Sequence, residues 1–137
     1  MCYALFDFKR RAVTIANSGL PYPIRSRAGE PGEPGSGASQ LEMPGVPLGS
    51  FPGSSYDEFT FDLKLGDVFV FCSDGVFEAN DALAREFGAK RLLKVVDETR
   101  HKSTREMVDA IFEAVQEFRG DTLPNDDMTA VAIKVTT

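Results

Sequence analysis

The segment that most constrains the fold is a run of five apolar residues, Val68–Cys72, which is soon followed by a carboxylate, Asp74. A short apolar run rich in valine and phenylalanine predicts a buried β-strand. A carboxylate cannot remain in the core unless its charge is compensated. The sequence therefore predicts a strand that ends at the rim of a sheet, with Asp74 placed where a compensating charge is needed.

Two more carboxylates, Asp126 and Asp127, stand immediately before a second strand-like segment, residues 128–135. If the two strands are antiparallel neighbours, the end of one lies beside the start of the other. Three carboxylates at one rim repel, so that without a cation at least one takes up a proton. A hard divalent cation, Mg²⁺ or Mn²⁺, prefers carboxylate oxygens and keeps several waters. The pattern is compatible with a cation site to which Gly75 lets the backbone approach. From spacing alone, solvated turns are the favoured interpretation, since Asp-Gly is common in turns.

Length and composition indicate one ordinary globular domain. The chain has 137 residues, of which 42% are hydrophobic and 26% charged, and this is typical of a globular domain with one core. Its formal net charge of −6 argues against nucleic acid and anionic membranes as partners, because both need a basic face. No apolar stretch is long enough to span a bilayer, and the N-terminus does not have the pattern of a secretory signal. Cys2 and Cys72 are predicted to be buried free thiols, so we expect a cytoplasmic protein.

The first part of the chain is predicted to be extended. Residues 2–8 and 12–17 alternate as two strands joined by a short polar turn. Prolines disfavour helix in residues 18–27. Residues 28–40 are rich in glycine and proline and hold no large apolar side chain, which predicts a mobile surface insertion within a single domain, residues 1–137.

Residues 56–72 are predicted to form a β-hairpin. Their first half alternates between apolar and polar side chains, and their second half is the apolar run. Gly66 and Asp67 lie between the halves and favour a turn. In the turn-rich segment that precedes this hairpin, we expect Val46 and Leu48 to anchor to the core.

Two helices are predicted after Asp74. The first covers residues 80–88, with Asn80 or Asp81 as N-cap and Gly88 as its end. The second covers residues 89–100, whose leucines and valines recur on one side.

A third helix has the clearest boundaries. Ser103 and Glu106 have the spacing of a capping box, and apolar residues then recur at helical spacing as far as Gly120. Residues 128–135 follow as a last strand. Strands, helices and a final strand in this order predict an α+β fold in which helices cover an antiparallel sheet.

In chain order, these motifs resemble the C-terminal part of the metal-dependent protein phosphatase (PPM) family, in the bacterial branch typified by the stage II sporulation protein E phosphatase. The matching segments are LFDFKRRAVTIANSGLPYPIRSR, GVPLGSF, LKLGDVFVFCSDGVFEAND, FGAKRLLKVV and PNDDMTAVAIKV. The resemblance implies antiparallel β-sheets flanked by helices in an αββα sandwich. It also implies a serine/threonine protein phosphatase with a two-metal centre of Mn²⁺ or Mg²⁺, in which activated water attacks phosphoserine or phosphothreonine. By the same resemblance, the substrate is an anti-sigma-factor antagonist.

The resemblance also assigns roles to residues at the rim. By motif, Asp74 and Asp126 are direct metal ligands. Asp127 orients a water or a ligand, and Gly75 supports the geometry of the site. Thr129 is structural.

The sequence departs from the family pattern at its start. The family's first motif, of the type D-x-x-G-h-G, carries the aspartate that bridges both metals, and we do not find it here. We therefore expect a domain that is incomplete at its N-terminus, holds at most one metal weakly, and has little or no activity alone. Leu20 stands where the branch often has histidine. Missing strands leave a sheet edge exposed, which favours a homodimer.

Three hypotheses remain open at this point. The chain is a fragment of a larger phosphatase, a degenerate phosphatase-like module that binds a partner or dimerises without catalysis, or a metal-binding or structural domain that only resembles the family. A binding module keeps its partner affinity without divalent metal. A phosphatase fragment hydrolyses an aryl phosphate only when the missing segment and the metal are supplied.

Overall fold

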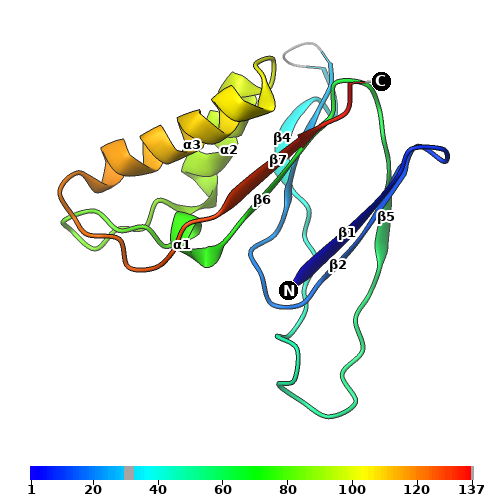
Figure 1. Cartoon of the computed structure of the whole chain (residues 1–137), viewed down its shortest axis with the longest axis horizontal. Coiled ribbons are helices and arrows are strands. Elements are labelled where there is room, and N and C mark those ends of the chain that lie inside the picture. Colours follow the sequence, from blue (N-terminus) through cyan, green and yellow to red (C-terminus); the bar gives the residue numbers. More distant parts are fainter. Residues whose placement is uncertain (30–32, 137) are drawn as a thin grey trace.

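Two antiparallel β-sheets form the centre of the protein (Figure 1), seen in a computed structural model that describes residues 1–29 and 33–136. The first sheet has the strand order β1-β2-β5 and the second sheet the order β4-β3-β6-β7. The strands of the first sheet are β1 (Cys2–Asp7), β2 (Ala12–Asn17) and β5 (Phe59–Asp62). Those of the second sheet are β3 (Ile24–Arg27), β4 (Gly37–Gln40), β6 (Val68–Cys72) and β7 (Ala130–Lys134).

Helices cover the second sheet on the side away from the first (Figure 1). They are α1 (Asp74–Phe77), α2 (Gly88–Thr99) and α3 (Thr104–Arg119). Among the described residues, no helix lies on the outer face of the first sheet, and none is long and apolar enough to cross a membrane. The predicted α+β fold, with antiparallel sheets and flanking helices, is confirmed.

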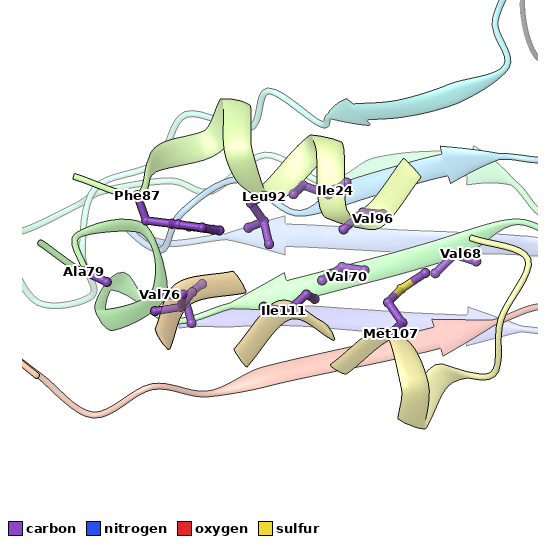
Figure 2. Packing of buried hydrophobic residues seen from close by; sticks show 11 residues of the cluster. Ile24, Val68, Val70, Val76, Ala79, Phe87, Leu92, Val96, Met107 and Ile111 are labelled. Carbon is purple, nitrogen blue, oxygen red and sulfur yellow. The ribbon is translucent and has the colours of Figure 1, made fainter. Parts of the chain in front are cut away.

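The apolar run of β6 is unbroken because this strand is buried on both faces. Val68 and Val70 point to the helices and pack with Leu92, Val96 and other buried residues (Figure 2). Phe69 points the other way, into a second core between the two sheets. There its ring meets Phe6 edge to face, with 5.6 Å between the ring centres.

Helix α3 begins and ends where the sequence predicts. The Ser103 hydroxyl accepts a hydrogen bond from the Glu106 amide (3.2 Å), and the Glu106 carboxylate accepts one from the Ser103 amide (2.9 Å). The two bonds form the predicted capping box. Gly120 follows the last turn with φ of 58°, a conformation that favours glycine.

We expect Ser103→Ala to lower the free energy of unfolding by about 1 kcal/mol, because the Glu106 amide loses its acceptor and the Glu106 carboxylate loses the hydrogen bond from the Ser103 hydroxyl. Hydrogen bonds from Ser103, first from its hydroxyl and then from its amide, hold the pKa of Glu106 below its usual value. A depressed pKa in the folded state contributes stability at neutral pH that is lost as the pH falls through it. Urea denaturation of the wild-type protein and of Ser103→Ala at several pH values measures the difference between their free energies of unfolding. This difference should shrink at acid pH, and a difference that does not depend on pH would contradict the assigned capping box.

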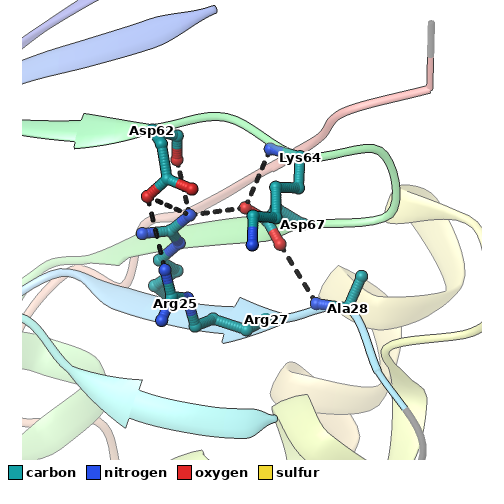
Figure 3. A network of polar contacts seen from close by, with 6 residues as sticks. All are labelled: Arg25, Arg27, Ala28, Asp62, Lys64 and Asp67. Atoms are coloured by element: carbon teal, nitrogen blue, oxygen red, sulfur yellow. Dashed lines mark hydrogen bonds and ion pairs between the residues drawn. The ribbon is translucent and has the colours of Figure 1, made fainter. Parts of the chain in front are cut away.

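The predicted hairpin over residues 56–72 is wrong. Strand β5 pairs with β2 in the first sheet, whereas β6 pairs with β3 and β7 in the second. The chain crosses between the sheets at Asp67, whose side chain is buried (Figure 3). Alternation predicts which face of a strand is buried, but it does not specify the partner strand.

The predicted helix over residues 80–88 is also wrong. Instead, the Asp81 carboxylate accepts hydrogen bonds from the amides of Leu83 and Arg85, both at 2.9 Å. These bonds close a tight loop. Gly88 begins α2, so the glycine interpreted as the end of one helix is the start of the next.

The segment 28–40 holds structure that its composition does not predict, because its last four residues form β4 beside β3. Residues 30–32, at the centre of the predicted insertion, lie outside the described residues. The mobility of the segment stays a prediction. Val46 and Leu48 do not anchor to the core, since 39% and 53% of their surfaces are exposed; Met43, just before them, is buried instead.

Candidate metal centre

The end of β6 meets the start of β7, as the sequence predicts. Cys72 lies opposite Ala130 in the antiparallel pair, and the Ser73 amide extends the ladder with a hydrogen bond to the Thr129 carbonyl (3.0 Å). Asp74 and the Asp126–Asp127 pair are therefore carried by two segments that face each other across one rim.

Ser73 joins these two segments through its side chain. Its hydroxyl accepts a hydrogen bond from the Thr129 amide (2.9 Å) and donates one to the Asp127 carbonyl (3.2 Å). This residue is not among those predicted from the sequence. A signal for it is present, because a hydroxyl side chain directly before an aspartate at a strand end often bonds to nearby backbone.

All three carboxylates at the rim are exposed to solvent. Asp74 is the first residue of the short helix α1, and its side chain, like those of Asp126 and Asp127, lies on the surface. The Asp126 carboxylate accepts a hydrogen bond from the Asp127 amide (2.7 Å). The rim is thus open to water and to ligands.

Gly75 brings the backbone of α1 against the backbone of the facing segment. A Cβ atom added at Gly75 would lie 2.2 Å from the Asp127 carbonyl oxygen and 3.2 Å from that of Asp126. No side chain fits at this distance. The close approach of the two segments therefore requires glycine, while any part that Gly75 takes at a metal stays a prediction.

The carboxylates fit a hard cation only in part. Within the part of the chain that the structure describes, no group of three His, Cys, Asp or Glu side chains is arranged to hold a metal. The expected convergence of three carboxylates is thus not present. Two exposed carboxylates from facing segments suit a cation such as Mg²⁺ that keeps most of its waters.

An apolar groove runs from this rim between the two sheets. Its volume is about 380 Å³. It is lined by Cys2, Ala4, Phe6, Leu20, Phe71, Cys72, Ser73, Thr129, Val131 and Ile133. Burial raises the pKa of the Cys72 thiol to about 12, so this thiol is neutral at physiological pH. Both cysteines are free, as predicted, and half-buried.

The architecture is that of the PP2C (PPM) class of phosphatases. The SiaA-PP2C domain of Pseudomonas aeruginosa superposes with a TM-score of 0.79 at 19% identity, over 97% of this chain and 50% of that one. The phosphatase domain of SpoIIE from Bacillus subtilis superposes with a TM-score of 0.73 at 17% identity, over 99% of this chain and 56% of that one. These likenesses define the fold.

Sequence comparison identifies the family within this class. Residues 1–136 match the family described as Stage II sporulation protein E (SpoIIE); the chain belongs to this family. It is also 29% identical over 144 aligned residues to the phosphoserine phosphatase RsbU of Bacillus subtilis. The alignment covers 98% of this chain and 38% of RsbU. The predicted family, the SpoIIE-like branch of the PPM phosphatases, is confirmed.

Proposed function

We propose that this chain is part of a metal-dependent serine/threonine protein phosphatase domain, which hydrolyses the phosphomonoester of a phosphoserine or phosphothreonine protein. The observation that carries the proposal is the rim of a SpoIIE-family fold, where Ser73 and Gly75 hold Asp74 against the Asp126–Asp127 segment. RsbU is named a phosphoserine phosphatase, which supports the same reaction class here.

In this proposal, Asp74 and Asp126 hold Mn²⁺ or Mg²⁺. Asp127 orients a water or a ligand, and Gly75 keeps the two segments in contact. A bound divalent cation supplies an activated water and offsets the charge of the phosphate. The protein positions the two carboxylates, because the ends of the strands and the Ser73 hydrogen bonds fix the backbone segments that carry Asp74 and Asp126.

Activity, substrate and compartment belong to the same proposal. The chain spans 50% of the SiaA domain and 38% of RsbU. We infer that it holds at most one cation weakly and is inactive or weakly active alone. We further propose that the complete domain acts in the cytoplasm on an anti-sigma-factor antagonist, and that the chain forms a homodimer through an exposed sheet edge.

A degenerate module without catalysis is the second candidate. It is favoured by the lack of a three-ligand metal group among the described residues. The two candidates differ in one measurable property. A partner-binding module keeps its affinity for the partner after divalent metal is removed, whereas a phosphatase hydrolyses an aryl phosphate only with Mn²⁺ or Mg²⁺ present.

Titration with Mn²⁺ tests the location of the metal site. We expect Asp74→Asn and Asp126→Asn each to weaken Mn²⁺ binding by about tenfold or more, because each removes a charged ligand. Asp121→Asn is a matched control, since Asp121 is an exposed aspartate of the preceding loop that the proposal does not use. Titration calorimetry measures the heat of Mn²⁺ binding, and electron paramagnetic resonance measures the concentration of free Mn²⁺. If neither rim substitution changes binding, the proposed site is wrong.

A further inference from the structure

A hollow lies between two loops of the chain, one that follows α1 and one that follows α3. Its volume is about 550 Å³. It is lined by Asp81, Ala82, Leu83, Arg85, Phe118, Arg119, Gly120, Asp121 and Thr122. In Figure 1 these two loops and Met1 lie on opposite sides of α1. The hollow is therefore distinct from the groove between the sheets, with which it shares no lining residue.

The two loops continue the segments that carry the candidate metal ligands. The first loop leaves α1, whose first residue is Asp74. The second loop leads from Gly120 to Asp126 and then into β7. A ligand in the hollow is thus held beside the rim by the same two segments that carry the carboxylates.

The first loop presents an apolar side chain in a fixed conformation. Leu83 is 73% exposed, and its amide donates a hydrogen bond to the Asp81 carboxylate (2.9 Å). The Arg85 side chain donates another to the same carboxylate (2.7 Å). Ala84 has φ of 57°, a left-handed conformation that is unfavourable for a residue with a Cβ atom. Strain of this kind, maintained by surrounding bonds, is typical of functional segments, and here it holds Leu83 in its exposed position.

A second exposed leucine stands on the other side of the hollow. Leu123 directly follows the lining residue Thr122 and is 81% exposed. The Thr122 amide donates a hydrogen bond to the Arg119 carbonyl (3.2 Å), which closes the turn before this leucine. Single exposed leucines are common on protein surfaces. Two of them beside one hollow form an apolar patch of the kind that marks an interaction site.

The positive charge of Arg119 lacks a carboxylate partner. Its Nη2 atom donates a hydrogen bond to the Gln116 side-chain oxygen (2.5 Å), whereas Nε and Nη1 are shielded from solvent and have no partner. Arg85 differs, because Asp81 neutralises it at 2.6 Å. Asp121 also lines the hollow, but it is exposed to water, and within the described ranges it forms no ion pair. A guanidinium without an acceptor gains most from a carboxylate, so the hollow favours a ligand that brings one.

We propose that the hollow and its two leucines form a docking surface for the protein part of the phosphorylated substrate, and that this surface binds an aliphatic side chain next to a carboxylate. The aliphatic side chain packs on Leu83 and Leu123. The carboxylate meets Arg119, whose side chain turns toward it at the end of α3; arginine is enriched at protein interfaces. A segment docked here raises the effective concentration of a phosphoserine at the rim. The assignment to a substrate rests on the proposed function, whereas the binding of such a segment does not.

Amide NMR titration of the chain tests the docking surface without metal or phosphate. The probe is an acetylated peptide in which one leucine stands between glutamates, and the same peptide with lysines in place of the glutamates is its control. The glutamate peptide should bind more tightly by about fivefold or more and should shift the amides of residues 81–85 and 118–123. Shifts centred on a basic segment elsewhere, such as residues 9–11, would overturn the inference. So would equal binding of the two peptides, or no binding of either.

Two substitutions should each weaken binding of the glutamate peptide by about fivefold or more. Leu83→Ser removes the apolar contact, and Arg119→Gln removes the charge but keeps a long polar side chain. Arg105→Gln is the matched control, because Arg105 is an exposed arginine of the same helix, about 20 Å from Arg119 along its axis. It should leave the affinity unchanged, and the amide spectrum shows whether each variant is folded. If Arg105→Gln weakens binding as much as Arg119→Gln, the peptide responds only to overall charge and the assigned surface is wrong.

A phosphoserine placed at several spacings from the leucine separates this inference from the proposed function. With Mn²⁺ present, a suitable spacing should add affinity that Asp74→Asn removes. If phosphoserine and Mn²⁺ add nothing but the peptide still binds at the hollow, the proposed metal site fails and the docking surface stands. If the phosphopeptide binds with Mn²⁺ but Leu83→Ser and Arg119→Gln leave its affinity unchanged, the rim is supported and the docking surface is wrong.

Discussion

Gly75→Ala should lower the free energy of unfolding by about 1–3 kcal/mol and weaken Mn²⁺ binding at the rim. The new methyl group would lie 2.2 Å from the Asp127 carbonyl oxygen, so one of the two backbone segments must move. Overpacking of this kind has a cost of that size. The displaced segment carries Asp126, and its carboxylate then loses its position relative to Asp74. Urea denaturation measures the first effect and Mn²⁺ titration the second.

Gly53→Ala is the control for Gly75→Ala. It separates the effect of the clash at Gly75 from the effect of replacing any glycine by alanine. Gly53 has φ of 76° and no atom within 4 Å of an added Cβ. Its substitution therefore adds backbone strain of about 1–2 kcal/mol without pushing on another segment. Mn²⁺ binding should be unchanged in this variant. Equal loss of Mn²⁺ affinity in both variants would show that the contact between Gly75 and Asp127 does not position the site.

Asp67→Ala should destabilise the fold more than Gly75→Ala, with a loss of about 3–5 kcal/mol. The Asp67 carboxylate accepts hydrogen bonds from Arg25 (2.6 Å), the Ala28 amide (3.0 Å) and the Lys64 amide (3.2 Å) (Figure 3). The Arg25 side chain is 5% exposed. Without its partner, this guanidinium is a buried and poorly compensated charge, which has a cost of that size. Chemical denaturation measures the loss.

Asp62→Ala is the matched control for Asp67. The Asp62 carboxylate also lies near Arg25, at 3.5 Å, but its side chain is 54% exposed. Exposed ion pairs contribute little, so this change should cost less than about 1 kcal/mol. Similar losses for the two variants would mean that the buried pair does not hold the crossover between the sheets.

The rim could be predicted from sequence because two local signals agree there. An apolar run marks β6, a second strand follows Asp127, and acidic residues stand where each strand meets the rim. Antiparallel pairing then places the two ends together without further information. The same logic predicts α3, because Ser103, Glu106 and Gly120 fix both of its ends locally.

Features that depend on distant partners could not be predicted. The crossover at Asp67 depends on Arg25, which is remote in sequence, and the pattern of β5 is equally compatible with either sheet. The loop at Asp81 begins with the same residue type as a helix, because an aspartate can accept amide bonds in both. The number of carboxylates that face one another at the rim depends on side-chain directions, which periodicity does not give.

Strand β6 links the two halves of the molecule. Its side chains enter both the core under the helices and the core between the sheets, so neither core can open while the other stays intact. The amides of β6 are therefore expected to exchange with solvent only through global unfolding. Residues 124–127 lie at the surface, and we expect their amides to exchange by local motion. Asp74 follows the end of β6 by two residues, so a ligand that bridges Asp74 and Asp126 is expected to tie this exposed segment to the end of the protected strand and to slow exchange in the segment.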